Sequence, residues 1–219
     1  DEPSTQVRLL TPPMYAEHMD VDPEGRDAPG TGQMSVLQAP GNYTVTLVVN
    51  GTEQKQSVEV LKDPNSAGSE ADIAAQLELL YKVKQDLEVG AKMVHEIEAL
   101  RVQLRTLMRL SEDEEVKEAA RALEEKLVEL EMNLVDLRQT GQGQDGVRFE
   151  AKILSKLGYL PRGLAYADFR PTGPEIEVQK ILHDRLAEHR RALGELVAGD
   201  VAELNGFLQG KGVAIIGRR

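Results

Sequence analysis

The sequence predicts a mainly α protein with a small β part, in which an antiparallel bundle of three long helices and one short helix follows a β hairpin or a partial sandwich. Residues 69–110 and two later stretches place apolar residues every three or four positions, the spacing that lines one face of a helix. Residues 41–62 instead alternate between apolar and polar side chains, which is the period of a strand. We therefore expect an irregular segment with a hairpin over residues 1–64 and the helical bundle over residues 65–219.

The composition favours helix packing and argues against several kinds of partner. The chain of 219 residues is 41% hydrophobic but only 4% aromatic, with no tryptophan, so its core must consist mainly of Leu, Val, Ile and Ala. Its net charge of −11 repels nucleic-acid phosphates and anionic membranes. There is no cysteine for a disulfide or a thiolate metal site, and no run of the ~20 apolar residues that a membrane span needs.

Residues 1–40 are rich in proline and glycine and lack periodicity, so they predict an irregular loop or linker. Gly25 lies among closely spaced carboxylates that could bind calcium, because calcium prefers oxygen ligands and the glycine permits a tight turn. The stretch lacks the closing Glu of an EF-hand loop, since Thr31 stands at that position. A solvated acidic loop is the favoured interpretation, and a weak calcium site is the alternative. Its candidate ligands are Asp20, Asp22, Glu24 and Asp27.

Residues 41–62 predict a β hairpin. Tyr43, Val45, Leu47 and Val49 alternate with other residues, and Asn50-Gly51 then supplies the residue pair that a type I′ turn prefers. A lone hairpin is marginally stable. We expect it either to join strands drawn from residues 5–38 in a small sandwich or to pack on something outside this chain.

The first long helix is predicted over residues 69–110. Ser69 and Asp72 nearly match the capping box that begins many helices. Glu, Lys, Gln and Arg fill the positions between the apolar residues, and no proline interrupts them. Residues 62–68 are turn formers that separate this helix from the hairpin.

Two further long helices and one short helix are predicted downstream. The second long helix follows a cap at residues 111–114 and carries an apolar repeat as far as Leu137. A flexible loop over residues 140–147 precedes a short helix that ends at Gly158, and residues 159–174 are expected to be irregular. The third long helix spans residues 174–208 and leaves an apolar tail, Val213–Ile216, which could be a strand, a plug for the bundle or a partner contact.

No catalytic constellation emerges from the sequence. His95 and Glu98 lie three residues apart on the first long helix, enough for a surface hydrogen bond but not for a metal cage. His189 lies on the apolar stripe of the last helix, where a hydrogen-bonded core histidine is the favoured interpretation. No His-Glu-x-x-His helix, phosphate-binding glycine loop or Gly-x-Ser-x-Gly elbow is present. We therefore assign no catalytic or cofactor-binding residue.

Most of this chain resembles a stretch near the end of certain bacterial secreted proteins, most strongly over residues 40–110 and weakly afterwards. The segments PGNYTVTL (40–47), VNG (49–51), SVEV (57–60) and KDP (62–64) resemble the pattern PG-x-YTV-x-L-x-V-x-G followed by L-x-V-x-x-DP, with Val58 at the position of the Leu in its second part. Those proteins carry a β-propeller of sortilin-like, BNR-type repeats and are often labelled glycosyl hydrolases. In them the stretch is an immunoglobulin-like segment followed by long helices. The propeller repeat Ser-x-Asp-x-Gly-x-Thr-Trp does not occur in this sequence.

The resemblance implies that the chain is the C-terminal part of a larger protein that is secreted or held in the periplasm or cell envelope. We expect a non-catalytic interaction or assembly module whose partner is another protein or an upstream propeller domain, or which forms a homo-oligomer. One alternative is part of a glycoside hydrolase whose catalysis lies in the upstream propeller. The other is a calcium-stabilised structural module.

Overall fold

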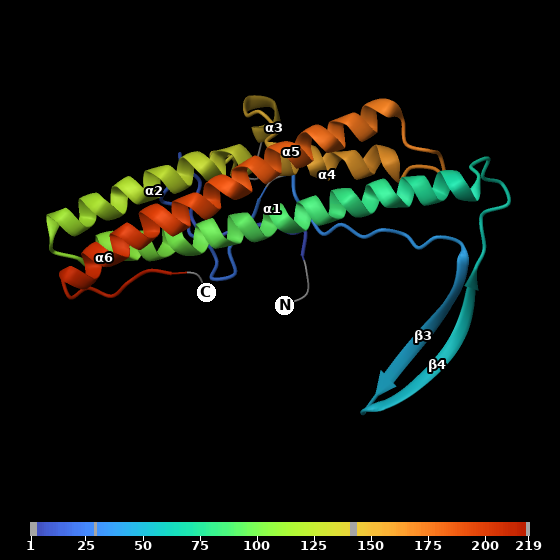
Figure 1. Cartoon of the computed structure of the whole chain (residues 1–219), viewed down its shortest axis with the longest axis horizontal. Helices are drawn as coiled ribbons and strands as arrows, with labels where there is room; N and C mark the ends of the chain where they lie inside the picture. The colour runs from blue at the N-terminus through green and yellow to red at the C-terminus, as the bar shows by residue number, and fades with distance from the viewer. Residues whose placement is uncertain (1–3, 29, 141–143, 218–219) are drawn as a thin grey trace.

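Helix α1 (Glu70–Leu110) runs along the whole helical body and packs against three of the other helices and one strand (Figure 1). The computed structural model describes residues 4–28, 30–140 and 144–217. At ~1.5 Å per residue the 41 residues of α1 span roughly 60 Å. The predicted cap is confirmed as a full capping box, in which Ser69 and Asp72 each accept a hydrogen bond from the other's backbone N–H. Hydrogen bonds from Ser69 and Arg170 lower the pKa of Asp72 to about 2.

The remaining helices form two further rows beside α1. Helices α2 (Glu114–Leu134) and α4 (Ile153–Leu164) follow one another along one row and run opposite to α1 (Figure 1). Helix α5 (Gly173–Leu196) returns along the third row, parallel to α1, and packs on α1, α2 and α4. The predicted bundle of three long helices and one short helix is therefore confirmed.

The third row continues beyond α5 without a break. A π-helical turn η1 (Val197–Val201) joins α5 to helix α6 (Ala202–Gly210). The tail after α6 lies along α1, where Gln103 exchanges two hydrogen bonds with the backbone of Gly217. The backbone of Ile216 exchanges two more with the Asn205 side chain of α6, at 2.8 and 2.9 Å. The Ile216 side chain joins the hydrophobic core. The tail thus behaves as the bundle plug that was one of its three predicted roles.

The N-terminal segment is part of the helical core although it contains little regular structure. Strands β1 (Arg8–Leu9) and β2 (Arg26–Asp27) form a two-stranded antiparallel sheet that packs on α1. Val7, Leu9 and Ala28 are buried with the Leu-rich faces of the helices. The core thus includes residues from both sides of the boundary expected at residue 64.

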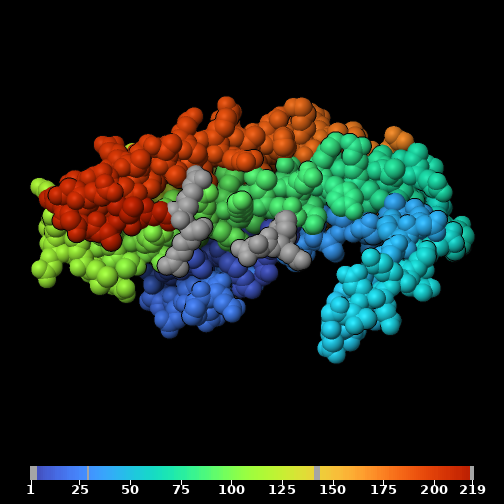
Figure 2. Space-filling model, turned by 60° about the horizontal axis from the view of Figure 1, so that its bottom comes forward, coloured from blue at the N-terminus to red at the C-terminus, as the bar shows by residue number. Residues whose placement is uncertain are grey.

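Strands β3 (Gly41–Val49) and β4 (Thr52–Val60) form the predicted hairpin, joined by Asn50 and Gly51. Both turn residues have positive φ, 50° and 81°, as a type I′ turn requires. Among the described residues, β3 and β4 pair only with each other, so residues 5–38 add no strand to this sheet. The hairpin projects from the end of the bundle where α1 begins (Figure 2).

Several predicted helix boundaries were wrong. Helix α2 starts from Asp113 as its cap and ends at Leu134, although Leu137 beyond it is still buried. A short helix, α3 (Asp145–Arg148), overlaps the end of the loop predicted over residues 140–147, of which residues 141–143 are outside the described residues. Helix α4 continues past Gly158, because this glycine serves packing rather than termination: a Cβ there would lie 2.9 Å from the carbonyl oxygen of Gly30.

Candidate interaction interface

The β3–β4 hairpin has two chemically different faces. Cross-strand register places Tyr43 opposite Val58 and Gly41 opposite Val60, with Val45 and Leu47 opposite glutamines. Directly paired residues share a face, so one face gathers most of the apolar side chains, and we call it the apolar hairpin face. Its apolar members are Tyr43, Val45, Leu47, Val49, Val58 and Val60.

The apolar hairpin face carries no charge, whereas the opposite face does. The other residues of the apolar face are Thr52, Gln54 and Gln56. The opposite face carries Glu53, Lys55 and Glu59 together with Asn42, Thr44, Thr46, Val48 and Ser57. An antiparallel sheet with one apolar and one polar face normally packs the apolar face onto a core.

This apolar face is open to solvent in the described structure. Val45, Leu47 and Val49 are 54%, 57% and 54% exposed, and the hairpin extends away from the helices (Figure 2). Single exposed apolar residues are ordinary on protein surfaces, but a contiguous apolar patch with polar surroundings is typical of an interaction site.

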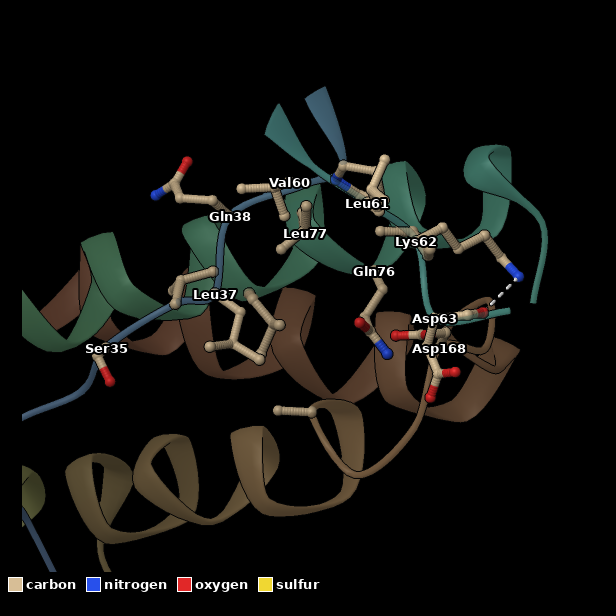
Figure 3. Close-up of a pocket in the computed structure, with 15 residues that line it drawn as sticks. Ser35, Leu37, Gln38, Val60, Leu61, Lys62, Asp63, Gln76, Leu77 and Asp168 are labelled. Atoms are coloured by element: carbon tan, nitrogen blue, oxygen red, sulfur yellow. Dashed lines mark hydrogen bonds between the residues drawn. The ribbon is translucent and has the colours of Figure 1, made fainter. Parts of the chain in front are cut away.

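The base of the hairpin leads into a groove on α1 that is lined by both apolar and polar residues. A cavity of about 230 Å³ lies between the residues that flank the hairpin and the first turns of α1 (Figure 3). Val60 from the apolar hairpin face and Leu77 from α1 both line it, together with the exposed Leu37 and Leu61. Apolar residues of the hairpin and of α1 therefore meet in this groove, beside the polar side chains of Lys62, Asp63 and Gln76.

Polar contacts fix the two ends of the hairpin at this groove. The Tyr43 hydroxyl donates a hydrogen bond to the carbonyl oxygen of Ala39 at 2.7 Å. The Lys62 ammonium donates to the carbonyl oxygen of Ser66 at 2.6 Å and, more weakly, to that of Asp63 (Figure 3). These bonds hold the residues just outside β3 and β4, so they restrain the base of the hairpin while leaving its apolar face uncovered.

A second candidate site is a cluster of charges inside the bundle, which we call the buried charge cluster: Glu98, Arg101 and Glu131. Arg101 is 1% exposed, and its Nη1 donates to Glu98 Oε1 at 2.6 Å and to Glu131 Oε2 at 2.8 Å. Thr11 completes the site, because its backbone N–H and its hydroxyl donate to the two oxygens of Glu98 at 2.7 and 2.9 Å.

Burial changes the proton affinity of one member of this cluster, Glu131. Desolvation and the negative charge of Glu98 raise the pKa of the Glu131 carboxyl well above its ordinary value, although Arg101 opposes the shift. Arg26 lies nearby and donates to the carbonyl oxygens of Thr11 and Gln139 at 3.1 and 2.8 Å, and burial lowers its pKa.

The buried charge cluster joins the N-terminal segment to α1 and α2. Its carboxylates are closed off from solvent, which does not suit them to the solvent-facing cleft of a glycosidase.

Sequence reasoning missed the buried charge cluster. Glu98 is not a surface residue as predicted, because it is fully buried and binds Thr11 and Arg101 rather than His95. His95 instead accepts a hydrogen bond from the Arg8 N–H at 3.0 Å, and burial lowers its pKa. The sequence feature that could have revealed this cluster is the position of its charges. Glu98 and Arg101 are three residues apart and adjoin the apolar stripe of α1, so their side chains can meet on the buried side of the helix.

The remaining predicted site residues do not assemble into a site. Asp20, Asp22 and Glu24 are exposed in the turn before β2, and Asp27 accepts from Gln6 and pairs with Arg8 at 2.8 and 3.2 Å. Across the part of the chain that the structure describes, no three His, Asp or Glu side chains lie close enough to hold a metal ion.

The other histidines of the helical bundle lie on α5. His183 is hydrogen-bonded through Nδ1 to Asp86 Oδ1 at 2.7 Å. His189 is partly buried, between the buried residues Leu186 and Leu193 in the sequence.

No described helix is both long enough and apolar enough to cross a lipid bilayer. Comparison with known proteins gives no family assignment, because no family model, curated protein or solved structure matches the chain.

Proposed function

We propose that this chain is a non-catalytic interaction and assembly module that binds a protein partner through the apolar face of its β3–β4 hairpin. The observation that carries the proposal is the contrast between the hairpin and the helices. The helices bury Leu and Val stripes in a common core, whereas Val45, Leu47 and Val49 remain about half exposed. Covering such a face is favourable by roughly 25 cal/mol for each Å² of apolar surface removed from water.

The charge distribution supports the same assignment. The chain carries a net charge of −11, yet the apolar hairpin face bears none of it. Interface centres are depleted of charge and rich in aromatic and apolar residues. Tyr43, Leu47 and Val58 therefore have the character of an interface centre, with Glu53, Lys55 and Glu59 kept on the opposite face.

We further propose, on the resemblance of residues 40–64 to the bacterial propeller proteins, that the module forms the C-terminal part of a secreted or envelope protein. Its partner would then be the upstream propeller domain or another protein of the same compartment. An immunoblot of the source organism under denaturing conditions tests this part, with a band well above the 24.1 kDa of the chain expected. A band near 24 kDa would contradict it.

The docking role itself can be tested by cysteine labelling, because the chain has no cysteine of its own. Leu47→Cys places a thiol on the apolar hairpin face, and Thr46→Cys places one next to it on the opposite face. Maleimide labelling is compared between the isolated 219-residue chain and the native protein in its source.

We expect the thiol of the Leu47→Cys variant to react quickly in the isolated chain and slowly in the native protein. The thiol of the Thr46→Cys variant should remain the more reactive of the two in the native protein. Equal and fast labelling of the Leu47→Cys variant in both preparations would show that the apolar hairpin face stays uncovered, and would overturn the proposal.

A further inference from the structure

We propose that the hairpin's partner is the β-sheet of a separate folded domain, which adds a strand to the free edge of β3 while it covers the apolar hairpin face. This inference rests on the proposed function and specifies the chemistry of the partner: a strand with unpaired backbone groups, and an apolar layer behind it.

The two edges of the hairpin differ in their charged residues: the β4 strand carries them and the β3 strand does not. β3 (Gly41–Val49) has nine residues without a charge or a proline. β4 (Thr52–Val60) carries Glu53, Lys55 and Glu59. Proteins protect edges that must remain free with charged residues, prolines and bulges, and a long uncharged edge invites pairing. The sequence has therefore protected the β4 edge and left β3 open.

The backbone of β3 offers a regular set of hydrogen-bonding groups at this edge. In an antiparallel hairpin closed by a two-residue turn, the residues that flank the turn form a hydrogen-bonded pair, and such pairs then alternate with pairs whose backbone groups point outward. With Val49 paired to Thr52, the outward positions on β3 are Asn42, Thr44, Thr46 and Val48. Among the described residues no strand pairs with this edge.

The apolar hairpin face indicates that the partner has more than one layer. A partner that only paired with β3 would leave Leu47 and Val45 exposed, because edge pairing does not cover either face. Sheets that pack face to face stand about 10 Å apart with their apolar sides together. The groove that continues from Val60 to Leu77 extends this apolar surface onto α1, so the covering layer can also contact the bundle.

A second copy of the hairpin is too small to be this partner. A two-stranded face of nine residues measures about 30 by 10 Å, so two hairpins packed face to face bury on the order of 600 Å² in total. Stable interfaces bury roughly 1,200–2,000 Å². A separate sheet that pairs with β3, covers the apolar face and reaches the groove can supply the additional area.

Site-specific photo-crosslinking in the native protein tests the inference, with Thr44 and Ser57 as a matched pair. These residues face each other across the hairpin and lie on the same polar face, but Thr44 is on the β3 edge and Ser57 on the β4 edge. p-Benzoylphenylalanine replaces Thr44, Ser57 or Leu47, one at a time, in the full-length protein in its source. The crosslinked peptides are then identified by mass spectrometry.

We expect Leu47 and Thr44 to crosslink to the same partner domain, Thr44 to a strand of that domain, and Ser57 to give at least about tenfold less product. Crosslinks from Leu47 but not from Thr44, or equal crosslinks from Thr44 and Ser57, would overturn edge pairing while leaving the proposed function intact. Crosslinks from Leu47 and Thr44 to the hairpin of a second copy would overturn the separate domain. No crosslink from Leu47 would overturn both the inference and the proposed function.

Discussion

Thr11 binds both carboxylate oxygens of Glu98, a residue 87 positions later in the chain, through its own backbone N–H and its hydroxyl. Glu98 also accepts from Arg101, so its charge is compensated although the side chain is fully buried. A buried carboxylate without such partners would cost several kcal/mol. Together with the Arg8–His95 hydrogen bond and the buried Val7 and Leu9, this contact fastens the irregular N-terminal segment to the middle of α1.

Removing the Glu98 carboxylate should destabilise the protein strongly. Glu98→Ala leaves the Thr11 N–H without its acceptor and removes one of the two carboxylates that accept from Arg101 Nη1, so we expect a loss of about 3–5 kcal/mol in the free energy of unfolding. Glu118→Ala is the matched control, because Glu118 forms an exposed pair with Arg121 on α2 and should cost less than about 1 kcal/mol. Urea unfolding followed by circular dichroism measures both, and equal losses would contradict the structural role.

Glu131→Gln should make the free energy of unfolding depend less on pH as the pH rises. The folded-state pKa of Glu131 is raised by burial and by Glu98, so this group favours folding fully below the ordinary pKa of 4.5, and that contribution is lost as pH rises through the folded-state pKa. Gln imitates the protonated carboxyl and cannot ionise. The unfolding free energy of the Glu131→Gln variant should therefore increase relative to that of the wild type as the pH rises from 4.5. A difference independent of pH would contradict the raised pKa.

Charged substitutions in the core of α2 should abolish cooperative unfolding. Leu127 and Leu134 are fully buried, and replacing both with Lys places two unpaired ammonium groups in an apolar interior. We expect the double variant to lose its cooperative melting transition. The control, Glu125→Lys with Glu129→Lys, changes exposed positions on the same helix and should retain that transition. A cooperative melt of the Leu127→Lys, Leu134→Lys variant would refute the core assignment.

The hairpin should contribute little to the stability of the isolated bundle. Leu47→Thr changes a side chain that is 57% exposed and lies outside the helical core, so we expect a change below about 0.5 kcal/mol. Leu104→Thr, at a fully buried position of α1, should cost several times as much. Differential scanning calorimetry of both variants measures the contrast. A large loss with Leu47→Thr would mean that the apolar hairpin face is already packed in solution.

The parts of the fold that local sequence determines were predictable, and those that depend on distant contacts were not. The stripe of α1, its Ser69 cap and the Asn50-Gly51 turn each follow from neighbouring residues. Glu98 and Arg101 are residue types usually found in solvent, and only Thr11 and Glu131, far away in the sequence, explain their burial.

The candidate site on the hairpin also depends on contacts that local sequence does not determine. The alternation in residues 43–49 predicts one apolar face, but alternation alone cannot say what covers it, because the covering residues belong to another segment. The predicted alternatives were strands from residues 5–38 or something outside the chain. The described structure gives the hairpin no strand from residues 5–38, so the choice between the two predicted alternatives became possible only when the strand pairing was known.

Calcium should leave the melting temperature nearly unchanged. Asp27 already pairs with Arg8 and accepts from Gln6. Asp20, Asp22 and Glu24 are exposed in the turn before β2, and among the described residues no three carboxylates lie close enough to share an ion. Because calcium needs six to eight oxygen ligands, we expect a shift below about 1 °C at about 1 mM calcium, which corresponds to only a few tenths of a kcal/mol at most. The measurement is a thermal melt with and without calcium, repeated on the Asp20→Ala, Asp22→Ala variant. A rise of several degrees that the variant abolishes would instead establish the calcium-stabilised module that the sequence left open.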